Sequence, residues 1–167
     1  MERKPALHVA VSACLVGRAC RYDGNHKLQD DAVRLLKKLS AHGANVVAVC
    51  PEELGGLGTP RPAAELDSPD ADLVWNGQSR VREVKTRRCV TDAFKAGAIE
   101  AFELAGDCSL AILKDGSPSC GVHCVWSNGV KVNGRGVFAT LLAKRGVRII
   151  SENEVHLVAG TDLVDVT

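Results

Sequence analysis

Short apolar runs alternate along this chain with segments whose apolar positions recur every three or four residues. The runs read LHVAVSA, NVVAVC, SLAILK and VRIIS, and they occupy residues 7–13, 45–50, 109–114 and 147–151. Continuous apolar runs of this length are typical of strands that are covered on both faces, as in a parallel sheet. The pattern therefore predicts four buried strands.

The segments between these runs have the spacing of amphipathic helices. In residues 28–42 the apolar stripe ends at Gly43, and in residues 90–106 it begins near Thr91 or Asp92 and ends at Gly106. Residues 136–146, GVFATLLAKRG, form a third helical segment. Alternating strands and helices favour an α/β fold: a mostly parallel sheet flanked by helices in three layers, Rossmann-like, with right-handed crossovers.

Three stretches do not follow this alternation. Residues 51–72 hold four prolines and three glycines, which indicates a long ordered loop that is kept for a function. Residues 73–84 resemble two short strands about the Asn76-Gly77 turn signal and are predicted to form a hairpin. Residues 115–135 are rich in glycine, serine and asparagine.

Length and composition fit one folded domain over residues 1–167. The chain is 46% hydrophobic and 25% charged, as in ordinary globular proteins. Lys and Arg number 21 against 20 Asp and Glu, so we expect no broad basic surface and no nucleic-acid partner. No apolar run approaches the roughly 20 residues that span a bilayer, which predicts a cytoplasmic protein without a membrane segment.

Seven scattered cysteines change this picture. An odd number in a domain of this size argues against a disulfide framework and favours reduced thiols that bind metal. Cys14, Cys50 and Cys120 each follow a predicted strand, and the carboxyl ends of parallel strands meet at the edge of the sheet where ligands bind. We therefore expect these three thiols to converge on a metal centre.

The spacing of these cysteines does not decide which metal binds. Iron-sulfur clusters and zinc both take thiolate ligands, but the chain has no CxxC pair and no compact ferredoxin-like run. Three ligands would leave one iron of a four-iron cluster free to act as a Lewis acid on a sulfur-containing substrate. The rival interpretation is a non-catalytic zinc-binding or metal-sensing module, closed by Cys124 as a fourth ligand.

Groups that handle protons lie beside two of the three cysteines. Glu52 comes two residues after Cys50, and Ser117 and Ser119 precede Cys120 in KDGSPSCG. A carboxylate can activate water and a hydroxyl can relay a proton, so Glu52 is the candidate base, with Glu65 as the alternative.

Other residues near these loops are candidates for binding a substrate. Cationic and aromatic side chains near these loops offer a site for a nucleotide phosphate: Arg21, Tyr22, Lys27 and Lys114. Trp75 and Trp126 are candidates for stacking on a base, although packing is the commoner role of tryptophan. Cys20, Cys89 and Cys108 are interpreted as packing residues, and Cys124 is also a candidate sulfur-carrying thiol.

A series of motifs adds a resemblance to these arguments. SACLVG and CRYDGNHK, then CPEELGGLGTPRPAAE, then LKDGSPSCG and RGVFATLLAKRGVRIISE follow one another between about residues 9 and 152. Their order resembles the thiouracil desulfidase family, formerly a domain-of-unknown-function family, DUF523.

The resemblance implies a [4Fe-4S] cluster on Cys14, Cys50 and Cys120, whose remaining iron accepts sulfur from a thiocarbonyl base so that water replaces it with oxygen. It places the catalytic carboxylate at Glu52 and the assisting hydroxyl at Ser119 or Ser117, with Ser119 preferred. The implied substrate is a small thiolated pyrimidine base or nucleotide, desulfurised without redox change by a monomer or small homo-oligomer.

Two stretches depart from the family pattern. Where relatives usually have Asp-Val-Thr before the second long helix, this chain has Cys89-Val90-Thr91. After the third cysteine, relatives commonly have a Tyr-Asp-Gly turn, whereas this chain reads HCVWSNG with Cys124 and Trp126 added. The first change removes a carboxylate from the start of the helix and alters its capping. The second alters the loop expected to contact the substrate.

Overall fold

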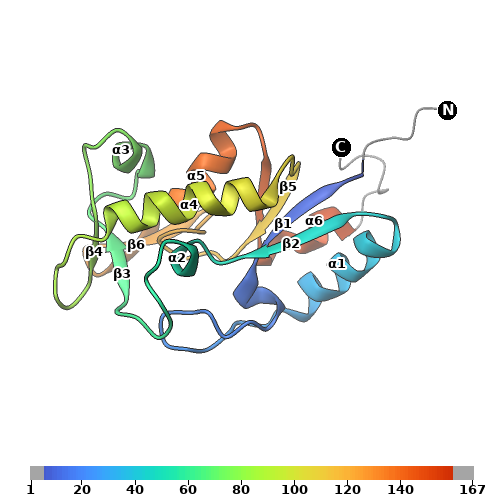
Figure 1. Ribbon diagram of the computed structural model, residues 1–167, viewed down its shortest axis with the longest axis horizontal. Helices are drawn as coiled ribbons and strands as arrows, with labels where there is room; N and C mark the ends of the chain where they lie inside the picture. Colours follow the sequence, from blue (N-terminus) through green and yellow to red (C-terminus); the bar gives the residue numbers. More distant parts are fainter. Residues whose placement is uncertain (1–5, 160–167) are drawn as a thin grey trace.

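A computed structural model describes residues 6–159 and contains the predicted parallel sheet. Its strands are β1 (His8–Ser12), β2 (Asn45–Val49), β5 (Leu110–Leu113) and β8 (Arg148–Ser151). They are ordered β2-β1-β5-β8, and every neighbouring pair is parallel (Figure 1). All four predicted strands are therefore confirmed.

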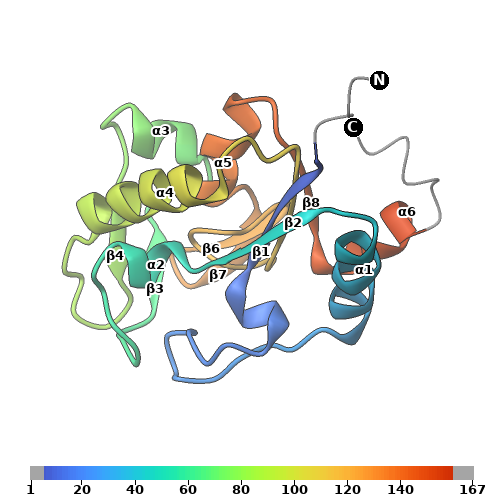
Figure 2. The ribbon, with the colours of Figure 1, turned by 45° about the vertical axis from the view of Figure 1, so that its right-hand side comes forward.

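Helices cover both faces of this sheet, as Figure 2 shows. Alternate residues of β1 point to opposite faces, as the pleat of a strand requires. Val9 and Val11 pack with α1 (Asp30–Ala41) and α6 (Val155–Ala159), whereas Ala10 packs with α4 (Thr91–Ala105) and α5 (Val137–Lys144). The three-layer α/β arrangement and all three predicted helices are confirmed.

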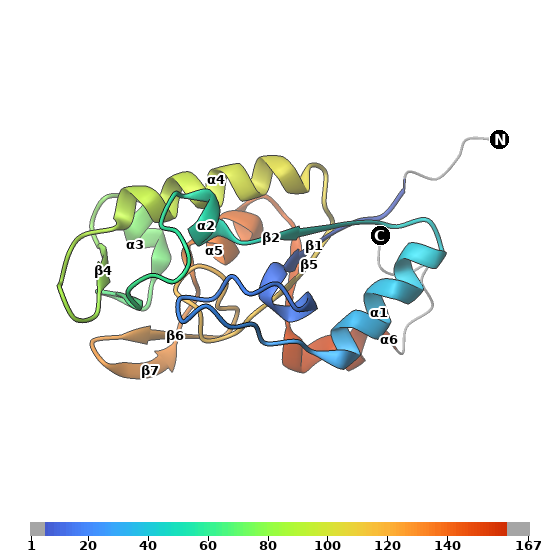
Figure 3. The same ribbon diagram turned by 60° about the horizontal axis from the view of Figure 1, so that its bottom comes forward.

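A second sheet lies beside the first and was not predicted. It is ordered β4-β3-β6-β7 and mixes antiparallel and parallel pairs. Its strands are short: β3 (Ala64–Leu66), β4 (Val81–Glu83), β6 (Cys124–Ser127) and β7 (Val130–Asn133). Figure 3 shows the β6-β7 hairpin extending from the body of the molecule. One apolar core includes residues of both sheets, among them Leu66, Val125 and Leu113.

The predicted hairpin over residues 73–84 is wrong. Residues Ala71–Trp75 form a helix, α3, because the Asp70 side chain caps it by accepting a hydrogen bond from Asp72 N at 2.9 Å. Asn76 and Gly77 end that helix, and Gly77 takes the positive φ of 78° that glycine tolerates. Only β4 remains from the predicted pair.

The proline-rich stretch 51–72 also contains regular structure. It begins with the short helix α2 (Pro51–Leu54) and continues into β3. Two 3₁₀ turns complete the described chain, η1 (Ala13–Val16) after β1 and η2 (Glu152–Glu154) after β8. Of the helices between residues 6 and 159, none combines the length and the hydropathy that crossing a bilayer requires.

The loop after β5 is folded around one carboxylate. Asp115 Oδ1 accepts hydrogen bonds from four backbone amides, those of Gly116, Val122, His123 and Cys124, at 3.0–3.2 Å. Burial alone raises the pKa of Asp115, but the amides outweigh burial and hold the pKa below its usual value. Asp115 thus fixes both ends of the loop that carries Cys120.

We expect Asp115→Asn to lower the free energy of unfolding by about 2 kcal/mol, because the amides lose a charged acceptor. A lowered folded-state pKa stabilises the protein above the unfolded-state value of about 4, and this stabilisation is lost as the pH falls through the folded-state pKa. The difference between wild type and variant, measured by urea unfolding, should therefore shrink in acid. The exposed control Asp107→Asn should change little, and equal effects of both variants would contradict this role of Asp115.

Candidate active site

Three cysteines from three strand ends line one cavity of about 480 Å³. Cys14 lies in η1 directly after β1, Cys50 directly follows β2, and Cys120 lies in the loop after β5. All three side chains are buried. The convergence expected from the strand ends is therefore present in the structure, at the carboxyl edge of the parallel sheet.

The thiols differ in their tendency to ionise. Burial, and then the nearby Cys50, raise the pKa of Cys14 to about 11, and burial raises the pKa of Cys120 to about 12. The pKa of Cys50 is lowered to about 7, chiefly because the Cys20 thiol donates a hydrogen bond to its thiolate. Thiolates at Cys14 and Cys120 need a cation beside them, so metal binding here releases protons.

The backbone around Cys120 is held by Ser117 and by the start of α5. Ser117 Oγ accepts from Ser119 N at 3.2 Å and from Cys120 N at 3.1 Å. The Ser119 carbonyl accepts from Phe138 N at 2.8 Å, and a Cβ at Gly136 would lie 2.5 Å from that carbonyl oxygen. The loop thus packs directly against the start of α5, which holds the backbone at Cys120.

A hydrogen-bonded series of side chains leads away from Cys120. Ser119 Oγ lies 3.7 Å from Cys120 Sγ and donates to Glu52 Oε2 at 3.3 Å. Ser117 Oγ and Ser119 Oγ lie 3.1 Å apart. Ser119 is 1% exposed, so bulk water does not compete for these contacts. The three predicted proton-handling residues therefore form one connected group on the cavity wall.

Glu52 is placed by the close packing of α2 on α4. A Cβ at Gly97 of α4 would lie 1.8 Å from the Pro51 carbonyl oxygen, and one at Gly55 would lie 2.1 Å from the Ala93 carbonyl oxygen. Neither position has space for a side chain. These two glycines let the helices approach closely enough to bring Glu52 to the cavity.

Arg61 is a site residue that the sequence interpretation missed. Its Nη2 lies 3.4 Å from Glu52 Oε2 and donates to the Cys20 carbonyl at 2.9 Å, and its side chain is 4% exposed. Nη1 donates to the Gly58 carbonyl and to Thr59 Oγ1. Its place within GTPRPAAE, next to the other motif residues, was the available signal. Arg61 joins α2 to the loop that carries Cys20.

Glu65, the alternative base, also lines the cavity, but both its oxygens are engaged. Oε1 pairs with Arg87 Nη1 at 2.9 Å, and Oε2 accepts from Gly129 N at 2.8 Å. These bonds connect β3 to the loop after β4 and to the turn of the β6-β7 hairpin. The contacts favour a structural role for Glu65.

The candidate phosphate ligands Arg21, Tyr22, Lys27 and Lys114 all line the cavity, as does Lys131 of β7. Lys114 Nζ is already paired with Glu152 Oε1 at 2.7 Å.

The two tryptophans differ in position. Trp126 lines the cavity and is 46% exposed, whereas Trp75 packs between helices and donates from Nε1 to the Val137 carbonyl.

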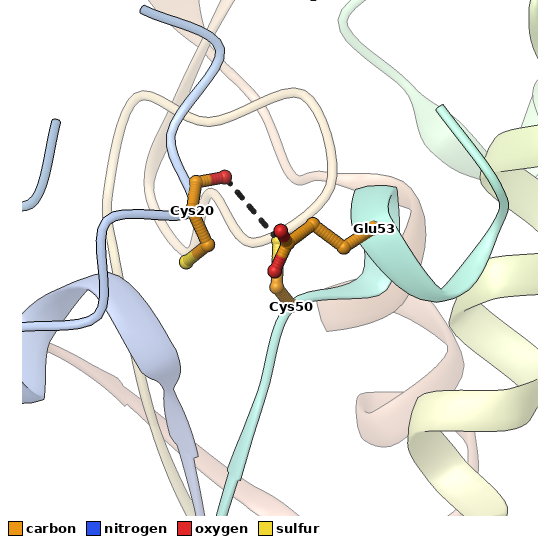
Figure 4. Close-up of side chains that lie close together, drawn as sticks. All are labelled: Cys20, Cys50 and Glu53. Carbon is orange, nitrogen blue, oxygen red and sulfur yellow. Dashed lines mark hydrogen bonds between the residues drawn. The ribbon is translucent and has the colours of Figure 1, made fainter. Parts of the chain in front are cut away.

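The four other cysteines are spread over the fold. Cys108 lies in the apolar core, Cys89 is exposed beside Arg80 and Thr91, and Cys124 lies on β6 outside the wall of the cavity. Cys20, by contrast, lines the cavity next to Cys50 and Glu53 (Figure 4). Sequence patterns could not distinguish Cys20 from Cys89 and Cys108, because none of the three directly follows a predicted strand.

The chain matches a known family over most of its length. The profile of the 2-thiouracil desulfurase family matches residues 9–154. An uncharacterised protein of Bacillus subtilis (strain 168), YbbK, is 37% identical over 153 residues, which cover 89% of this chain and 97% of that protein.

A solved structure shares the fold. The [4Fe-4S]-dependent thiouracil desulfidase TudS superposes with a TM-score of 0.77 at 35% identity, covering 92% of this chain and 95% of that chain. The family profile spans the parallel sheet and every residue that brings a thiol or carboxylate to the cavity. This chain is a member of the 2-thiouracil desulfurase family.

Proposed function

We propose that this protein removes sulfur from a thiolated pyrimidine by a hydrolytic, non-redox reaction in which C=S and water give C=O and sulfide. The observation that carries the proposal is the joint placement of three thiols and the Glu52, Ser119 and Ser117 group on one cavity wall. Its volume of about 480 Å³ lies in the range of small-molecule sites. The relation to TudS supports the same reaction class.

The donor set fits an iron-sulfur cluster held by Cys14, Cys50 and Cys120. Thiolates are the usual ligands of such clusters. Within residues 6–159, these three sulfurs are not a set that lies within 4.8 Å of one another, so their spacing does not suit a single ion. When bound, a [4Fe-4S] cluster with three protein ligands supplies an open iron, a Lewis acid with affinity for the substrate sulfur.

The closed zinc site has less support. It needs Cys124 beside the other three cysteines. Cys124 begins β6, its backbone amide donates to Asp115 Oδ1, and its side chain does not line the cavity. Moving Cys124 to the cavity would break the Asp115 contacts.

Proton movement is assigned to the chain's own side chains. Glu52 accepts a proton from the attacking water and is oriented by Arg61 on one side and Ser119 on the other. Ser119, which lies between Glu52 Oε2 and Cys120 Sγ, passes a proton toward the departing sulfur. Ser117 holds Ser119 through both its hydroxyl and its backbone amide.

Substrate binding is assigned to the outer part of the cavity. The half-exposed Trp126 ring offers a face for a pyrimidine. The ion pairs of the described residues engage Arg21, Arg61 and Lys114 but neither Lys27 nor Lys131. We therefore assign Lys27 and Lys131 to the phosphate of a thiolated nucleotide.

The first test is anaerobic reconstitution with iron and sulfide, followed by assay of sulfide release from 2-thiouracil and thiouridine monophosphate. We expect about four irons per chain and release from at least one substrate. Cys14→Ser should lose the cluster, whereas Cys89→Ser and Cys124→Ser should keep it. An intact cluster without sulfide release from either compound would contradict the proposed substrates, and one zinc without labile sulfide would favour the closed site.

We expect Glu52→Gln to lower kcat by about 10²- to 10⁴-fold while iron content is unchanged, because the amide cannot accept the proton of water. The matched variant Glu65→Gln changes the other cavity carboxylate in the same way and should cost much less in kcat. If Glu65→Gln removes activity and Glu52→Gln does not, the assignment of the base is wrong.

For the phosphate assignment, Lys131→Ala should raise KM for thiouridine monophosphate about tenfold, the size of one lost charge-assisted hydrogen bond. KM for free 2-thiouracil should stay the same, because the base lacks a phosphate. Lys37→Ala removes an exposed lysine of α1 and serves as the control. Equal changes in KM for the two substrates would show that Lys131 does not bind the phosphate.

A further inference from the structure

A second group of metal-type ligands lies at one side of the cavity. Cys20 Sγ, Cys50 Sγ and a carboxylate oxygen of Glu53 all lie within 4.8 Å of one another. Figure 4 shows the three residues close together on two segments, Cys20 in the loop after η1 and Cys50 and Glu53 at the start of α2. Two of these residues, Cys20 and Glu53, have no role in the proposed desulfurisation.

The spacing of these atoms suits one small ion. A tetrahedral zinc ion with sulfur ligands at about 2.3 Å and oxygen at about 2.0 Å separates its ligand atoms by about 3.3–3.8 Å. A group held within 4.8 Å reaches that geometry with small rotations of the side chains. The set formed by Cys14, Cys50 and Cys120 does not meet this limit among the described residues.

The local bonding leaves Glu53 available as a ligand. Its Oε2 accepts a hydrogen bond from Thr59 Oγ1 at 2.8 Å, which orients the carboxylate. Within the described residues Oε1 is shielded from solvent and accepts no hydrogen bond, although Arg18 Nη2 lies 3.1 Å away without hydrogen-bond alignment. The Arg18 side chain is 57% exposed, so this pair is weak and the guanidinium can move aside.

The two cysteines are already in contact through polar groups. Cys50 Sγ lies 3.6 Å from the Cys20 carbonyl oxygen, and that carbonyl also accepts from Arg61 Nη2. Arg61 therefore fixes the Cys20 backbone beside Cys50. Both cysteines are buried, with 2% of Cys20 and 8% of Cys50 exposed.

We propose that Cys20, Cys50 and Glu53 form a mononuclear site for a thiophilic divalent cation such as Zn²⁺, and that this site competes with the iron-sulfur cluster for Cys50. Two thiolates and one carboxylate are a ligand set that zinc accepts, with a fourth position left to water. Cation binding displaces the thiol protons into solvent and involves no change of oxidation state. The competition rests on the proposed cluster, but the cation site does not.

The test uses the full chain, cluster-free and reduced, titrated anaerobically with Co²⁺ and then with Zn²⁺. We expect one Co²⁺ per chain with thiolate charge-transfer and tetrahedral ligand-field absorption, its displacement by Zn²⁺, and a rise in Tm with zinc. Cys20→Ser and Glu53→Gln should each weaken Zn²⁺ binding. We expect Cys20→Ser to lower the affinity by more than about 100-fold, because mutating a residue that only orients a metal ligand already lowers metal affinity 10- to 100-fold.

Cys14→Ser is the matched control, because it removes a thiol of the same cavity that lies outside this set. It should bind Co²⁺ as wild type does while failing to hold the cluster. Co²⁺ binding without thiolate charge-transfer absorption would overturn the proposed site. Co²⁺ binding that is as strong in both Cys20→Ser and Glu53→Gln as in wild type would overturn it as well. Because metal titration needs neither cluster nor substrate, this result stands apart from success or failure of the desulfidase assay.

Competition is measured by cluster assembly. Wild-type protein preloaded with Zn²⁺ should regain the cluster more slowly than zinc-free protein, and Cys20→Ser treated with the same zinc should not be delayed. Equal assembly by zinc-loaded and zinc-free wild type would overturn the sharing of Cys50.

Discussion

The whole site depends on one constraint, that parallel strands end at a common edge of their sheet. Cys14 and Cys50 follow β1 and β2, which are hydrogen-bonded neighbours, and Cys120 follows β5 on the other side of β1. Residues far apart along the chain therefore reach one cavity without any local cysteine motif. The sheet itself is held by apolar layers on both faces, so the ligands stand on a rigid base.

The edge of the sheet fixes the thiols, and separate devices fix the groups around them. Asp115 gathers the backbone amides of the Cys120 loop, and the start of α5 holds the same loop from its other side. The close approach of α2 and α4 delivers Glu52, and Arg61 ties it to the backbone of Cys20. Buried hydrogen bonds of this kind hold these side chains in fixed orientations, and such orientation in advance is what the proposed reaction requires of the protein.

Sequence reasoning succeeded where periodicity is strong and failed where short segments depend on tertiary contacts. The four apolar runs and three amphipathic stripes all have the predicted type. The Asn-Gly signal at residues 76–77 ends a helix, because Asp70 caps α3 just before it. The second Asn-Gly pair makes the tight hairpin turn instead, with φ of 51° at Asn128 and 76° at Gly129.

The candidate site was partly accessible from the same patterns. The predicted strand ends identified the three cysteines. Closeness in sequence to Cys50 and Cys120 then identified Glu52, Ser117 and Ser119. Arg61 and Cys20 lie in loops without periodicity, and their closeness to Glu52 and Cys50 arises only when η1 and α2 come together. Deciding which of Trp75 and Trp126 lines the cavity likewise required the three-dimensional arrangement of the strands and helices.

The proposed cluster at the edge of the sheet leaves one coordination position for the substrate. Mössbauer spectroscopy of protein reconstituted with ⁵⁷Fe tests this most directly. We expect one iron distinct from three similar ones, and a change confined to that iron when 2-thiouracil is added. Four equivalent irons that do not respond to 2-thiouracil would contradict it.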